Sequence, residues 1–130
     1  MSLAVPAELL HRAESGEVSD VDFVDCVRRS LPYAWAVVSR VAAAAHTGSG
    51  PFADHTTPPP SEDHRGQLLR ALASDAIRGA LQRHFGVVLA FQNCHRVAAF
   101  VPTADRGPDH AAFTSARAQL LNQSPELRDC

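Results

Sequence analysis

The stretch that decides the fold is SEDHRGQLLRALASDAIRGALQRHFGVVLAFQNCHRVAAFV, residues 61–101. Before Gly86, leucine and other apolar residues recur every three or four positions, which is the period of a helix that buries one face. Ser61 is a typical N-cap residue, and glycine is the residue that most often ends a helix. The sequence therefore predicts one long helix over residues 61–85.

The part after Gly86 has the character of strands. β-Branched and aromatic residues form two runs, 87–91 and 96–101, separated by a segment of turn length. We expect an antiparallel β-hairpin at about residues 87–101. Both of its strands are apolar on both faces, and an isolated hairpin is marginal in water. Helices or a second subunit must therefore cover it.

Four more helices are expected on either side of this region. Pro32 stops one helix and suits the first turn of the next, which is apolar nearly all round and so calls for a central position or for cover by a partner chain. The expected helices cover about residues 6–15, 20–30, 32–46 and 108–123.

The predicted fold class is mostly α, with about five helices packed around one β-hairpin. A length of 130 residues fits a single domain, residues 1–130. Residues 47–60 are rich in Gly, Ser, Thr and Pro and are expected to form a flexible loop, which is either functional or simply mobile. Residues 124–130 are expected to form a polar C-terminal tail.

The composition excludes several kinds of chemistry. All 12 basic residues are Arg, and without Lys there is no Schiff-base amine, phosphate-loop Lys or Ser/Lys nucleophile. No glycine-rich dinucleotide fingerprint follows a predicted strand, so we expect no nucleotide cofactor.

The charge and targeting signals favour a cytoplasmic protein without nucleic-acid partners. The formal net charge is −2 and the arginines are dispersed, which argues against nucleic-acid binding. Even those on the predicted long helix point in several directions: Arg65, Arg70, Arg78 and Arg83. The start of the chain lacks the pattern of a signal peptide, and no apolar stretch is long enough to cross a membrane. The three cysteines are widely spaced and are expected to be reduced thiols.

The densest group of reactive side chains is Cys94, His95 and Arg96, at or near the hairpin turn. A histidine beside an arginine can lower the pKa of a cysteine, which makes a reactive thiol conceivable. Neighbouring strand residues point to opposite faces, however, and this favours a structural role.

A second candidate site consists of histidines and one carboxylate. His46, His55 and His64 are spaced nine residues apart, with Asp54 beside the middle one. Imidazole and carboxylate are good zinc ligands, but helical zinc motifs place their ligands three or four residues apart. A mobile loop that carries histidines is the commoner explanation of the pattern.

The chain also resembles a known group of proteins. The residues that carry the resemblance are GQLLRALASDAIRGALQRHFG from Gly66, FQNCHRVA with Phe100 after it, and LLNQSPELRDC at the C-terminus. They are similar to an uncharacterised family of small actinobacterial proteins. The resemblance implies a bacterial source and no activity, ligand or site residue.

These observations favour a non-catalytic protein-interaction or self-associating module of the bacterial cytoplasm. The motive is the amount of apolar surface on the helix at 32–46 and on the hairpin. The alternative is a small thiol- or metal-dependent enzyme that uses Cys94 with His95, or His and Asp residues of the 46–64 region.

Overall fold

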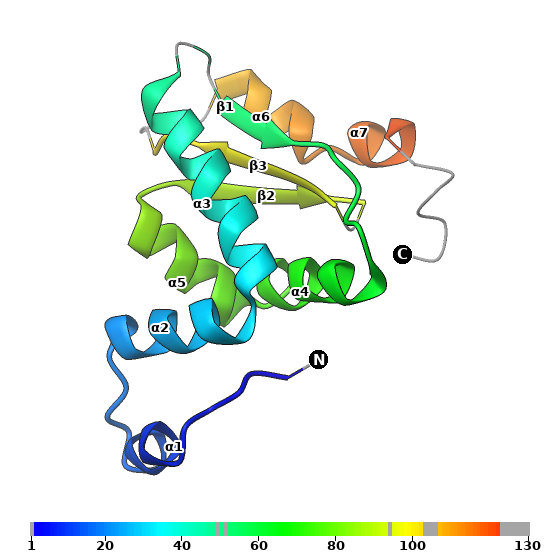
Figure 1. Cartoon of the computed structure of the whole chain (residues 1–130). Coiled ribbons are helices and arrows are strands. Elements are labelled where there is room, and N and C mark those ends of the chain that lie inside the picture. The colour runs from blue at the N-terminus through cyan, green and yellow to red at the C-terminus, as the bar shows by residue number, and fades with distance from the viewer. Residues whose placement is uncertain (1, 49, 51, 94, 103–106, 123–130) are drawn as a thin grey trace.

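The fold is that of a computed structural model, which describes residues 2–48, 50, 52–93, 95–102 and 107–122 (Figure 1). Helices dominate, as predicted, and the strands form one antiparallel sheet. In chain order the elements are α1 (Ala7–Glu14), α2 (Asp20–Ser30), α3 (Pro32–Thr47), β1 (Phe52–His55), α4 (Glu62–Leu72), α5 (Asp75–Phe85), β2 (Val88–Gln92), β3 (Arg96–Phe100), α6 (Gly107–Phe113) and α7 (Ala116–Leu121).

The predicted long helix over 61–85 is in fact two helices. α4 ends at Leu72 and α5 begins at Asp75, and the Ser74 hydroxyl accepts a hydrogen bond from the backbone N–H of Ile77 at 3.3 Å. Ser74 thus acts as an N-cap in the middle of the predicted helix. The break lets the apolar faces of both helices enter one core, whereas a straight helix would turn one of them away.

The predicted hairpin is present and gains a third strand from the region predicted as a loop. β1 pairs with β3, with Phe52 opposite Phe100 and His55 opposite Val97, and the strand order is β1-β3-β2. The prediction of a loop over 47–60 is therefore wrong for Phe52–His55. The reason is that β3 offers a second row of backbone hydrogen-bonding groups, which a four-residue strand can satisfy without a periodic pattern of its own.

Helices cover both faces of the sheet. On one face Val97 and Ala99 of β3 belong to the main core with α3, and on the other Ala98 and Phe100 pack with Phe113 of α6. The expectation that helices sandwich an entirely apolar hairpin is confirmed. Figure 1 shows α3 crossing the sheet, with α6 on the opposite side.

α3 occupies the central position predicted for it. Its valines are almost completely buried, and its exposed positions are Pro32, Ala36, Arg40, Ala43, Ala44, His46 and Thr47. The first turn depends on a distant residue, because Leu31 supplies no side-chain cap. The buried Gln67 of α4 accepts hydrogen bonds from the N–H groups of Tyr33 and Ala34, at 2.7 and 3.3 Å.

Among the described residues, every helix is too short or too polar to traverse a lipid bilayer. The predicted polar tail, residues 124–130, lies outside the described part of the chain.

Candidate functional site

The hairpin turn uses its polar groups to hold its own shape. Asn93 has a φ of 53°, in the left-handed region that asparagine tolerates better than most residues. The ring of the buried His95 lies with Nδ1 2.8 Å from the carbonyl oxygen of Asn93. Cys94 lies outside the described residues, so a reactive thiol beside His95 stays a hypothesis.

The side chain of Arg96 on β3 contacts both the neighbouring strand β1 and the helix α6. Its guanidinium forms an ion pair with Asp54 of β1 at 3.1 Å and lies 4.9 Å from the ring centre of Phe113. Both charged side chains are partly buried, with 25% and 31% of their surfaces exposed. This pair ties β1 to β3 across the sheet.

The structure does not bring the three evenly spaced histidines together. The Nε2 atom of His46 lies 2.8 Å from the carbonyl oxygen of Phe85, at the end of α5. His64 lies at the start of α4, against the ring of Tyr33. Within the described ranges, no three His, Cys, Asp or Glu side chains converge as metal ligands would.

The electrostatics of His55 are clearly perturbed. Its Nε2 atom is buried and has no hydrogen-bond partner among the described residues. Burial lowers the pKa of His55 below 6.5, and the positive charge of Arg40 and the nearby His95 lower it further. His55 is paired with Val97 of β3, so it lies at the same end of the sheet as His95. Sequence reasoning missed this because it depends on the pairing of β1 with β3.

A different surface places an exposed apolar side chain, Val21, beside a hollow lined by the aromatic ring of Trp35. Two adjoining hollows of about 240 and 190 Å³ lie where α2, α3 and α5 meet, and both are bordered by Val21, Val24 and His84. Val21 is 78% exposed, while Val24 is only 6% exposed. The Trp35 ring lies 5.3 Å from the ring of His84.

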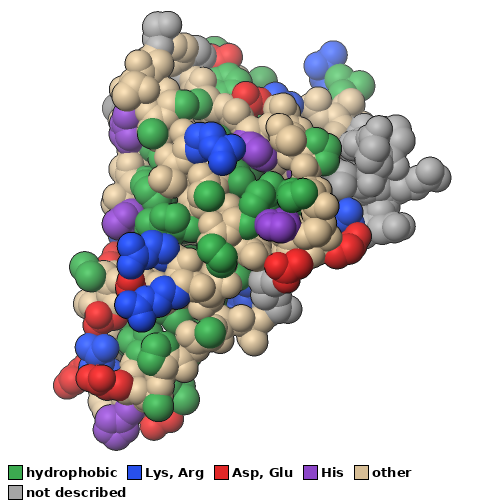
Figure 2. Space-filling view, viewed as in Figure 1, with side chains coloured by type: hydrophobic (Ala, Val, Ile, Leu, Met, Phe, Trp, Pro, Cys, Tyr) green, Lys and Arg blue, Asp and Glu red, His purple; other side chains and the backbone are tan. Residues whose placement is uncertain are grey.

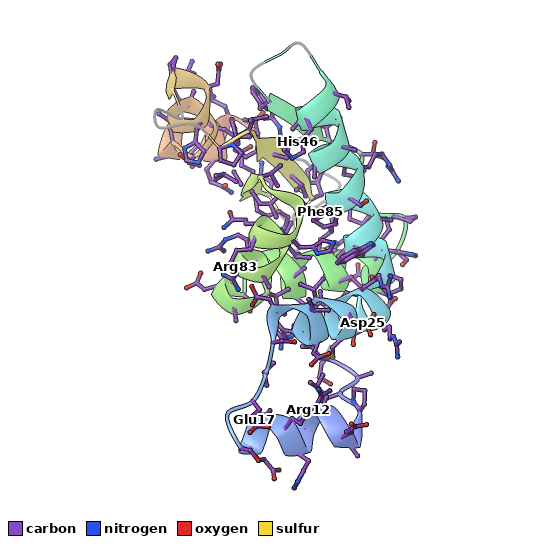
Figure 3. All side chains as sticks on the ribbon, turned by 90° about the vertical axis from the view of Figure 1, so that its left-hand side faces the viewer. Arg12, Glu17, Asp25, His46, Arg83 and Phe85 are labelled. Carbon is purple, nitrogen blue, oxygen red and sulfur yellow. The ribbon has the colours of Figure 1, made fainter. Side chains whose placement is uncertain are left out.

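Two ion pairs flank these hollows. Asp20 binds Arg83 of α5 at 2.6 Å, and Asp25 binds Arg28 on α2 itself at 2.5 Å. The hydrogen bonds and charge of Arg83 lower the pKa of Asp20. Figure 3 shows Arg83 and Asp25 on opposite sides of this region. We call it the Val21 patch: Val21, Val24, Trp35 and His84, with the flanking ion pairs Asp20–Arg83 and Asp25–Arg28.

A larger hollow of about 560 Å³ lies between the sheet and the last two helices. Phe52 and Arg96 line it from the sheet, and Arg117 and Leu121 line it from α7. Its arginine on the sheet is already neutralised by Asp54. Among the described residues that line the hollow, no buried charged side chain is therefore left to bind a ligand of opposite charge.

The geometry defines a small mostly helical protein, with helices on both faces of a three-stranded antiparallel sheet and no described cluster of metal ligands. The chain belongs to the NucS shadow ORF family, whose model matches residues 1–130. The family is uncharacterised, which agrees with the resemblance drawn from the sequence. Neither the curated proteins nor the solved structures include a match.

The name of the family model begins with KH, which is also the name of a nucleic-acid-binding module. KH modules clamp four nucleotides with a Gly-x-x-Gly loop. None of the seven glycines of this chain is followed by another three residues later. α4 and α5 are joined by Ala73 and Ser74, without glycine. The chain thus lacks the sequence by which such modules hold a nucleic-acid backbone.

Proposed function

We propose that this protein is a non-catalytic module that binds protein through the Val21 patch. The observation that carries the proposal is the exposure of Val21 beside a hollow floored by Val24 and Trp35. Apolar anchors next to aromatic hollows with a charged rim are typical of protein-binding surfaces.

The Val21 patch, and not the apolar helix or the hairpin that the sequence pointed to, is the surface we propose for association. The valines of α3 face the sheet, and α3 and α6 cover the two faces of the hairpin. Neither element needs a partner chain for cover. Among the described large apolar side chains Val21 has the greatest exposed fraction, 78%, ahead of Leu120 at 73%, and this supports α2 as the contact element.

A thiol or metal enzyme finds less support in the geometry. His46 and His64 each contact a group that has a structural use, the end of α5 and the ring of Tyr33. Arg96 is engaged by Asp54. These described side chains of the alternative therefore hold the fold, whereas the buried Nε2 atom of His55 has no partner among the described residues.

The proposed setting is the cytoplasm of an actinobacterium. Cys26 is a free, buried thiol, as expected in a reducing compartment. The 22 alanines and the use of arginine as the sole strong base support a GC-rich genome.

Co-purification from a lysate of the source bacterium tests the proposal. We expect the wild-type chain to retain a defined protein and the Val21→Asp variant to lose it, because a carboxylate in the contact must give up its water. Leu120→Asp is the matched control, since Leu120 is 73% exposed on α7 and lies outside the patch. Equal recovery by wild type and Val21→Asp would contradict the proposal.

A further inference from the structure

We propose that the partner at the Val21 patch is a second copy of this chain, packed around a two-fold axis that passes near Val24. This inference rests on the proposed protein-binding function and identifies its partner. It comes from the order of apolar and charged side chains along α2, which complements itself when one copy is turned end to end.

The apolar part of the patch contains both a projection and a hollow. Val21 projects, being 78% exposed, and the hollow beside it is bordered by Trp35 and His84. In a two-fold interface both copies present the same surface, so that surface must supply both shapes. Val21 of each copy then fills the hollow of the other.

The patch carries charges of both signs in nearly equal number. Asp20 and Asp25 are negative, Arg28 and Arg83 are positive, and Arg29 beside the patch also pairs with Asp25 at 3.0 Å. A strongly acidic or basic partner would therefore gain little attraction and would leave some of these groups unmatched. A neutral surface that carries both signs is the better match. Figure 2 shows acidic, basic and hydrophobic side chains interspersed along the edge formed by α5 and α2.

The order of the charges selects an antiparallel arrangement of the two α2 helices. Asp20 opens α2, Arg28 lies near its end, and Val24 is midway between them. The two charged positions are about 12 Å apart along the axis at roughly 1.5 Å per residue. Antiparallel packing around Val24 places each Asp20 opposite Arg28 of the second copy, whereas parallel packing would place like charges together.

Both charged groups can accept this second partner. The side chains of Asp20 and Arg28 are 58% and 54% exposed, although each already has a partner within its own chain. A carboxylate accepts several hydrogen bonds and a guanidinium donates five. The dimer thus adds ion pairs at its rim without breaking those of the monomer.

Sedimentation velocity of the full chain, from low to high micromolar concentration, tests the inference. We expect wild type and Leu120→Asp to form a dimer, and Val21→Asp to dissociate about 30-fold more readily, because each dimer loses the valine contact twice. Far-UV circular dichroism and urea unfolding show that the variants keep the fold. A wild type that stays monomeric throughout this range overturns the inference, and so does a dimer that withstands Val21→Asp.

Charge reversal gives a second, independent test of the arrangement. Asp20→Arg and Arg28→Asp should each weaken the dimer by about threefold to tenfold. The double variant Asp20→Arg/Arg28→Asp restores opposite charges across the two-fold axis and should recover most of the loss. A double variant that is weaker than both single variants overturns the antiparallel pairing.

The two proposals fail separately. If wild type is monomeric but still retains a different protein from the lysate in a Val21-dependent manner, the second copy is ruled out and the protein-binding function stands. If the chain dimerises through another surface, so that Leu120→Asp and not Val21→Asp dissociates it, the second copy is ruled out at the Val21 patch. The protein-binding function is then wrong only if Val21→Asp also leaves co-purification unchanged.

Discussion

The side chain of Gln67 should stabilise the fold by accepting the hydrogen bonds of two backbone N–H groups in the first turn of α3. Pro32 occupies the first helical position and has no N–H, so Tyr33 and Ala34 provide the first donors that need an acceptor. Gln67 accepts from both with one carbonyl oxygen. Because Gln67 is only 6% exposed, water is a poor substitute for it.

Substitution of Gln67→Met keeps the length of the side chain and removes this acceptor. Leaving a buried N–H without a partner costs about 1–3 kcal/mol. Two such groups, one of them in the half-buried Tyr33, give a loss of about 2–4 kcal/mol, and the more apolar methionine offsets about 1 kcal/mol of it. We therefore expect the free energy of unfolding to fall by about 2 kcal/mol and Tm by about 8 °C.

Urea unfolding, followed by tryptophan fluorescence and far-UV circular dichroism, measures this loss. The protein has a single tryptophan, Trp35, and it lies in the first turns of α3. Gln82→Met is the matched comparison, because Gln82 accepts one backbone N–H, that of Leu89, at 2.9 Å. It should lose about half as much stability. A Gln67→Met variant within about 0.5 kcal/mol of wild type would refute the reasoning, since surface substitutions commonly fall in that range.

Three further predictions concern single residues. Because the pKa of folded His55 lies below 6.5, the unfolded chain binds more protons, and stability should be complete above pH 6.5 and decline as the pH falls through the lowered value. Urea unfolding at several pH values should show a smaller decline for His55→Phe, and an equal decline would contradict the assignment. Ser74→Ala removes the N-cap that starts α5 and should cost about 1 kcal/mol in the same assay, with no loss counting against a capping role. Gly86→Ala places a side chain at a φ of 65° and should lower Tm by several degrees, while an unchanged Tm would show that this turn tolerates the strain.

Most of the helices could be predicted because their signals are local, although the single helix predicted over 108–123 is in fact two, α6 and α7, with Ser115 as the N-cap of the second. Ser61 caps α4 through the N–H group of His64, as the sequence suggested, and Ser19 caps α2 in the same way through Asp22. The boundary between α2 and α3 follows from Pro32 in the same way. The division of 61–85 carried an equally local signal in Ser74 followed by Asp75. The leucine pattern hides this signal because it continues across the break.

The third strand and the charged pairs could not be predicted, because they depend on contacts between distant residues. β1 is four residues long, and its pairing partner lies more than forty residues later. Arg96 finds Asp54, and His46 finds the end of α5, only after the sheet and helices have come together. The Val21 patch escaped notice for the same reason, since Trp35 and His84 are far apart in the chain.

The position of β3 has a consequence for synthesis of the chain. β3 is the central strand of the sheet but the last of the three to leave the ribosome. Until Phe100 has been made, β1 and β2 have no strand to pair with, and the valine face of α3 is without its cover. At about 5–20 residues per second, the interval between the end of α3 and the end of β3 lasts roughly 3–10 seconds. During that time the apolar face of α3 is accessible to chaperones and to other nascent chains.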